Sequence, residues 1–245
     1  PGRAIDNPPG HFNLFDLNDY SAQNYICQLL DAIHFYGAKA TGYLMADPGW
    51  MYPDGKMPPM PDGGMALPPM PGIGPKEPEC TETDRARSAE DDNPPMDPIS
   101  SYTKEMMANY CRNVAREASD LKRLGFDIIS MHCCYRHSPH GRFLSPLTND
   151  RTDEYGPQSV ESRSKFMLEI YQAIRDAVGP NTPLEIVYSV DEDSVGGYTV
   201  EDTIEFCKLA DGLIDIIHLR SGEMDPQHPL GFTSTEEMPT PYLEN

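Results

Sequence analysis

The stretch VESRSKFMLEIYQAIRDAVGPNTPLEIVYS, residues 160–189, combines a helix and a strand with a glycine between them. Residues 160–178 are predicted to be helical, and Gly179 follows as the residue that ends the helix, because helices commonly stop at a glycine. The segment PLEIVYS is typical of a short buried strand. This order of helix, glycine and strand sets the pattern of the whole chain.

The same unit occurs three more times. Each copy has a predicted helix followed by a predicted strand: residues 19–36 and 38–45, residues 101–122 and 126–132, and residues 200–210 and 214–220. Gly37 and Gly125 end the first two of these helices, and Ser101 is the expected N-cap of the second. Regular alternation of helix and strand predicts right-handed crossovers and a parallel sheet, so the fold class is α/β.

Charge and composition restrict the kinds of partner. The 245 residues carry a formal net charge of −20, with a pI near 4.5. This charge disfavours nucleic acid and anionic membranes, because both attract clustered Lys and Arg. No apolar run approaches the roughly 20 residues needed to span a bilayer, and no segment resembles a signal peptide. We therefore expect a cytoplasmic protein whose partner is neither nucleic acid nor a membrane.

The cysteines have neither the spacing of a metal site nor the density of a disulfide framework. They are scattered at Cys27, Cys80, Cys111, Cys133, Cys134 and Cys207. Reduced thiols are the expected state. A vicinal disulfide between Cys133 and Cys134 is an alternative, although its geometry is strained.

Residues 47–97 interrupt the pattern. They hold twelve prolines and six methionines, with eleven acidic against four basic residues, and this composition predicts an irregular insertion. One interpretation is a solvated excursion from the end of the first strand. The other is a lid, in which methionines and Tyr52 close over an apolar ligand.

In parallel α/β proteins, chemistry collects at the carboxyl ends of the strands. His132, Tyr188 and Arg220 end the second, third and fourth predicted strands, so we expect them to face one cleft. A zinc hydrolase is an alternative, with candidate ligands that all follow or end the second strand: His132, Cys134, His137 and His140. Their spacing matches no familiar zinc site, and His137 and His140 are equally typical of exposed loop residues.

The motif FLSPLTNDRTDEYG, residues 143–156, is expected to fix the long loop after the second strand. Arg151, Asp153 and Tyr155 can cross-link this loop through charge-assisted hydrogen bonds. The motif therefore has a structural role in this interpretation.

The same motif, continued by SVESRSKFMLEIYQAIRDAVG, resembles the old yellow enzyme family of FMN-dependent NADH:flavin oxidoreductases. It is most similar to the enoate-reductase and dienoyl-CoA-reductase branch of anaerobic bacteria. Three further pieces support the resemblance: LLDAIHFYGAKATGYLM, AREASDLKRLGFDIISMH and VGGYTVEDTIEFCKLADGLIDIIHLRSG. The resemblance implies a (β/α)8 TIM-barrel domain, of which residues 1–245 contain about four βα units, with residues 47–97 as an insertion or lid.

The resemblance also implies a substrate site. In the family, the strand that corresponds to residues 126–132 ends in a His-x-x-His or His-x-x-Asn pair, which holds the substrate oxygen above the flavin. The matching positions are His132 and Tyr135. A tyrosine can donate a hydrogen bond, and it can also deliver a proton. His137 occupies the place where a tyrosine of the family often supplies that proton.

The positions that would contact the cofactor depart from the family pattern. Tyr43 matches a glutamine that bonds the flavin ring, and Val187 matches an arginine beside the flavin. Valine has neither charge nor donor with which to stabilise a reduced flavin. Arg220 is a further candidate flavin ligand. The family's phosphate-holding segment has no counterpart here, and the iron–sulfur cysteines of the branch would lie beyond this chain.

Two functions are therefore considered. The first is an FMN-dependent ene-reductase, which takes hydride from NAD(P)H and reduces the activated alkene of an enone or unsaturated acid. The second is a noncatalytic barrel relative that has lost flavin and serves as a binding or partner subunit. The exposed edges of a four-strand sheet favour an oligomer or a longer polypeptide, and we expect the chain by itself to hold FMN only weakly.

Overall fold

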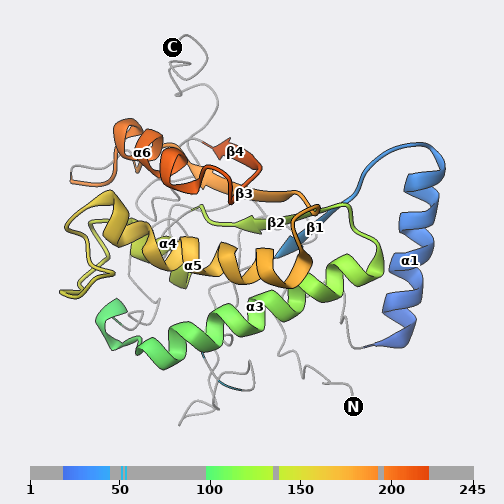
Figure 1. Ribbon diagram of the computed structural model, residues 1–245, viewed down its shortest axis with the longest axis horizontal. Helices are drawn as coiled ribbons and strands as arrows, with labels where there is room; N and C mark the ends of the chain where they lie inside the picture. The colour runs from blue at the N-terminus through green and yellow to red at the C-terminus, as the bar shows by residue number, and fades with distance from the viewer. Residues whose placement is uncertain are drawn as a thin grey trace, which may run out of the picture.

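The computed structural model describes residues 19–44, 51, 53, 98–134, 138–192 and 196–220. These residues form strands and helices in alternation (Figure 1). The elements in chain order are α1 (Tyr20–Phe35), β1 (Thr41–Leu44), the 3-10 helix η2 (Ile99–Ser101), α3 (Lys104–Leu124), β2 (Ile128–His132), α4 (Pro139–Leu144), α5 (Val160–Val178), β3 (Leu184–Ser189), α6 (Val200–Ala210) and β4 (Ile216–Arg220). The predicted helices and strands are all present, within a few residues at their ends.

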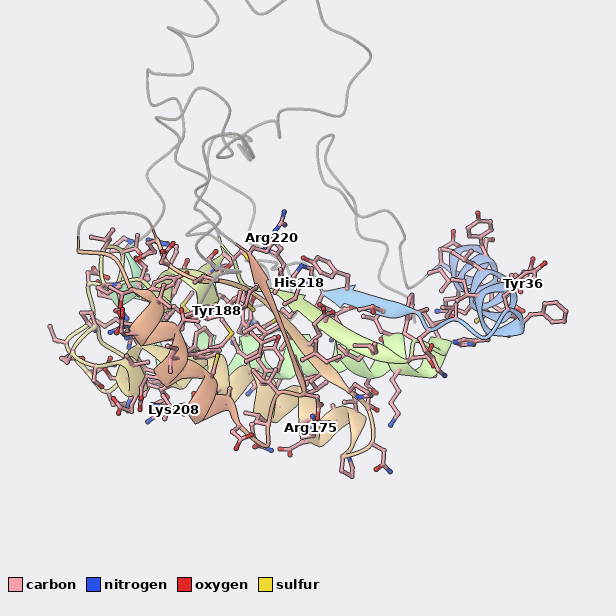
Figure 2. The ribbon with its side chains drawn as sticks, turned by 90° about the horizontal axis from the view of Figure 1, so that it is seen from above. Tyr36, Arg175, Tyr188, Lys208, His218 and Arg220 are labelled. Atoms are coloured by element: carbon pink, nitrogen blue, oxygen red, sulfur yellow. The ribbon has the colours of Figure 1, made fainter. Side chains whose placement is uncertain are left out.

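The four strands form one parallel sheet in the order β1-β2-β3-β4. Figure 2 shows that α3, α5 and α6 all lie on the same face of this sheet. A doubly wound sheet would carry helices on both faces and would reverse its strand order. Sequential order with helices on one side is the arrangement of neighbouring βα units in a barrel wall. The prediction of parallel strands is confirmed.

Side chains alternate between the two faces of the sheet. One face packs on the helices and forms the main core, to which Ile129, Met131, Ile186 and Tyr188 belong. The opposite face, here called the inner face, carries the residues between them: Thr41, Tyr43, Ile128, Ser130, His132, Glu185, Val187, Ser189, Ile216, His218 and Arg220. The inner face is thus much more polar than the helix-covered face.

The second helix begins later than predicted. Ser101 was the expected N-cap, but it lies in η2, where its backbone N–H donates to the carbonyl of Pro98. Thr103 is the actual cap, and its hydroxyl accepts from the backbone N–H of Met106 at 3.1 Å. Both residues carry a capping hydroxyl, and the extended backbone at Thr103 decides between them. Gly125 ends the helix with φ of 109°, as predicted.

Arg151 organises the loop between α4 and α5, which confirms the structural role of the motif at residues 143–156. Its guanidinium makes a bidentate contact with Asp153, in which Nε donates to Oδ1 at 2.9 Å and Nη2 donates to Oδ2 at 2.5 Å. It also donates to the carbonyls of Ile99 and Tyr102 at 3.0 and 2.6 Å. The same guanidinium lies over the ring of Tyr155 at 5.7 Å. One buried side chain therefore ties the loop to the segment that precedes α3.

Most of the predicted insertion, residues 47–97, lies outside the described residues. Met51 is an exception: it is buried in the main core, and its carbonyl accepts from the side chain of Asn109 at 3.3 Å. Among the residues that the structure describes, no helix combines the length and apolar character needed to cross a bilayer.

Candidate active site

The polar residues of the inner face lie in rows, because the parallel ladder places their Cα atoms side by side. Tyr43, Ser130 and Glu185 form one row; His132, Val187 and His218 form the next; Ser189 and Arg220 form the last, nearest the carboxyl ends. Figure 2 shows Arg220 pointing away from the helices. The inner face thus carries His132, Tyr43 and Arg220, with Tyr43 and Arg220 on the two outer strands of the sheet.

Tyr43 and His132 are neighbours on this face. Their ring centroids are 6.1 Å apart, with the planes inclined at 62°. Burial raises the pKa of the Tyr43 hydroxyl, so this hydroxyl stays protonated and remains a hydrogen-bond donor at neutral pH. The pair therefore offers an imidazole and a phenol to one ligand.

His218 is an inner-face residue that the sequence interpretation did not single out. Its Nδ1 atom lies 3.4 Å from Oε1 of Glu185 on the adjacent strand. The signal was present in the sequence, since His218 stands two residues before Arg220 and alternate residues of a strand share a face. The site therefore has a second imidazole, in the same row as His132.

Tyr188 does not share this face, so the prediction that it joins His132 and Arg220 in one cleft is wrong. Its ring stacks on Phe206 of α6 at 4.5 Å and lies 6.0 Å from the ring of Tyr198. Burial raises its pKa. Tyr188 is a core residue of the helix-covered face, and its neighbour Val187 lies on the inner face instead.

His140 is buried, which contradicts its interpretation as an exposed loop residue. Its Nε2 lies 2.9 Å from the carbonyl oxygen of His132, and its Nδ1 lies 2.7 Å from the hydroxyl of Tyr110. A carbonyl can only accept, so Nε2 carries the proton and Nδ1 accepts from Tyr110. Burial lowers the pKa of His140 to about 4. His140 is therefore a neutral structural residue that fixes the backbone at the end of β2.

This arrangement also weakens the zinc alternative. Both ring nitrogens of His140 are engaged, and the described residues contain no group of three or more side chains that could hold a metal ion. His137 and Tyr135 lie outside the described residues, so their proposed roles stay predictions.

Cys133 and Cys134 are free thiols, so the vicinal disulfide is not formed. Cys133 points into the core, where its Sγ lies 3.6 Å from Sδ of Met167. Burial raises the pKa of Cys134 to about 11 and that of Cys133 still more strongly. Neither thiol is ionised at neutral pH, which makes both poor nucleophiles.

The inner face suits the polar edge of a flavin ring better than it suits a phosphate. Tyr43, His132 and Arg220 supply donors for ring carbonyls and nitrogens, and the buried hydroxyl of Ser130 has no hydrogen-bond partner among the described residues. The described part of this face has one arginine and no lysine. Val187, in the row between His132 and His218, adds no charge to this face.

The chain was compared with known proteins. Residues 16–225 match the NADH:flavin oxidoreductase / NADH oxidase family. An NADPH dehydrogenase of Bacillus cytotoxicus is 33% identical over 129 residues, which are 52% of this chain and 36% of that protein. The chain spans 20% to 40% of the length of the five curated relatives compared here.

Solved structures give the same fold. A 2-naphthoyl-CoA reductase, in complex with 2-naphthoyl-CoA, has a TM-score of 0.60 and 24% identity, covering 92% of this chain and 32% of that one. The old yellow enzyme homologue from Zymomonas mobilis has a TM-score of 0.55 and 20% identity, covering 84% of this chain and 54% of that one. These likenesses confirm the TIM-barrel type of fold. The family match covers most of the length of the chain. We therefore conclude that the chain belongs to the NADH:flavin oxidoreductase / NADH oxidase family.

Proposed function

We propose that the chain forms the substrate-facing part of an FMN-dependent oxidoreductase that uses NAD(P)H to reduce an activated alkene, such as an enone or an unsaturated acid. The observation that carries the proposal is the position of His132. It ends β2 on the inner face, beside Tyr43, and its carbonyl is held by buried His140. Membership of the family supports the flavin and the nicotinamide.

The role of His132 follows from the chemistry of conjugate reduction. When bound, FMN supplies the hydride transfer from the nicotinamide to the substrate. Negative charge then develops on the carbonyl oxygen of the substrate, and a donor aimed at that oxygen stabilises it. His132 is the proposed donor. Tyr135 is proposed as the second donor and as the source of the proton for the α-carbon, with His137 as the alternative proton source.

Tyr43 and Arg220 are proposed to hold the flavin ring. A protonated phenol donates to a ring nitrogen or carbonyl, and a guanidinium favours the negative charge of a reduced ring. Arg220 acts to lower the pKa of Tyr43, but burial, which raises it, has the larger effect. Both groups lie on the inner face, so one ring could contact them together.

The second candidate is a noncatalytic relative that binds a ligand or partner without flavin. Val187 favours it, because an uncharged side chain stands in the middle of the row between His132 and His218. The first candidate, the oxidoreductase, would also accept a dienoyl-CoA or an enoate as its substrate, as the resemblance to the enoate-reductase and dienoyl-CoA-reductase branch implies.

A visible absorption spectrum of the purified protein tests the flavin. Anaerobic oxidation of NADH or NADPH with an enone or an unsaturated acid, followed by chromatography of the product, tests the reaction. Absence of flavin after supplementation with FMN, together with absence of alkene reduction, would favour the noncatalytic alternative.

A further inference from the structure

His218 and Glu185 form a second functional pair on the inner face. We propose that His218 contacts the polar edge of the bound flavin ring through Nε2, and that Glu185 positions it. This inference rests on the proposed function, because the ring that His218 contacts is the flavin. Neither residue takes part in the proposed contacts of His132 with the substrate or of Tyr43 and Arg220 with the flavin.

The ladder places His218 level with His132. Both Cα atoms are aligned with that of Val187, one from each side. Neighbouring strands lie about 4.8 Å apart, so the backbones of the two histidines are separated by about 10 Å. Two imidazoles with an apolar valine between them suit a flat ring system, which has polar edges and apolar faces.

The contact with Glu185 determines which nitrogen of His218 is presented to a ligand. Nδ1 lies 3.4 Å from Oε1 of Glu185, so Nε2 is the nitrogen on the far side of the ring. The side chain of His218 is 55% exposed and that of Glu185 only 17%. Glu185 is therefore mostly buried, while most of the His218 side chain is exposed and accessible to a ligand. The edge of a flavin ring presents both acceptors and donors of hydrogen bonds, so Nε2 of His218 can find a partner there.

A purely structural role explains this pair poorly. The strands β3 and β4 are already joined along their length by the parallel ladder. The pair His34–Asp127 shows the contrast: Asp127 binds His34 at 2.6 Å, Lys39 at 2.7 Å and the backbone N–H of Ala40 at 2.9 Å, and so closes a turn. No comparable backbone contact involves the side chains of Glu185 or His218 among the described residues.

The test is a titration of FMN into the 245-residue chain, followed by quenching of flavin fluorescence. The variants are His218→Ala, Glu185→Ala, the double variant and His218→Gln, with His34→Ala as the matched control. Loss of one hydrogen bond predicts that His218→Ala weakens FMN binding about three- to tenfold. Glu185→Ala should weaken binding less, and the double variant should bind like His218→Ala, because Glu185 acts through His218.

His218→Gln should restore part of the affinity, since its amide nitrogen reaches the place of Nε2. Thermal unfolding of each variant without FMN shows whether the fold is unchanged. Additive losses in the double variant would overturn the positioning role of Glu185. If the wild-type chain binds FMN and His218→Ala binds it with an affinity within twofold of the wild type, this inference is overturned but the proposed function is not. A wild-type chain that shows no saturable binding of FMN would contradict the proposed function, and this inference with it.

Discussion

The imidazole of His140 connects the hydroxyl of Tyr110, at 2.7 Å, to the carbonyl oxygen of His132, at 2.9 Å. A residue of α4 thereby fixes the backbone of the candidate substrate ligand from the side of the core. The pair Tyr110–His140 is fully buried. The position of His132 thus depends on two side chains that contact no substrate.

The burial of His140 predicts a pH-dependent stability. Its pKa falls from 6.5 to about 4 in the folded chain, because burial disfavours the charged ring. The unfolded chain therefore binds a proton between about pH 6.5 and pH 4 that the folded chain does not, and stability falls as the pH falls through this window. The loss amounts to about 3 kcal/mol at the acid end. Urea unfolding at several pH values measures it.

The matched variant for this experiment is His140→Gln, which lacks the titrating ring and should lose most of the slope between pH 4 and 6.5. His34→Ala should retain it. Should the glutamine variant not fold, NMR of the wild-type histidine rings gives the answer directly. A His140 ring that is protonated at pH 6 would contradict the prediction.

Arg151→Ala is expected to lower the free energy of unfolding by about 3 kcal/mol. The substitution removes the contacts to Asp153 and takes one donor each from the carbonyls of Ile99 and Tyr102. Arg123→Ala is the control, because the ion pair of Arg123 with Asp120 is exposed. Denaturant unfolding compares the two. Equal effects of both substitutions would show that Arg151 does not organise the loop.

His132→Ala is expected to slow alkene reduction by about 100-fold or more, since one donor to the developing oxyanion is lost. Flavin content should stay at the wild-type level. Turnover per bound flavin is the measurement, with His34→Ala as the control. Loss of flavin with normal turnover of the remainder would assign His132 to the cofactor instead of the substrate.

The 245-residue chain by itself is expected to bind FMN only weakly, with a Kd above about 1 µM. The described inner face has the uncharged Val187 in the row between His132 and His218 and offers no lysine for the phosphate. Fluorescence titration with FMN measures the affinity. Stoichiometric binding below micromolar concentration would show that Tyr43 and Arg220 suffice as ligands.

The helices and strands could be predicted from the sequence because their signals are local. Glycines end α1 and α3, and apolar spacing marks the helices. The face of the sheet on which Tyr188 lies could not be predicted. The segment LEIVYS is buried on both sides and shows no alternation of polar and apolar residues. The stacking of Tyr188 on Phe206, a residue of the later helix α6, shows that Tyr188 lies on the helix-covered face.

The same limit applies to His140 and α4. A histidine in a polar segment gives no sign of burial, and its partner Tyr110 lies thirty residues earlier. A local signal for α4 did exist, since Ser138 caps the helix and Pro139 occupies its first position. The placement of His132 and Arg220 at the ends of β2 and β4 was therefore predictable, because it depends on the limits of single strands. The candidate site was not predictable where it depends on contacts between distant segments.

The packing of α1 has a consequence for how the chain opens. Figure 1 shows α1 beside the sheet, and only Ile26 and Leu30 of this helix are buried, in a small cluster with Ala40 and Leu124. By contrast, α5 buries eight residues. Local opening should therefore begin at α1, whose amide protons should exchange with solvent long before those of α5. His132 lies on β2, whose central residues are buried in the main core, so fluctuations of α1 would leave its position intact.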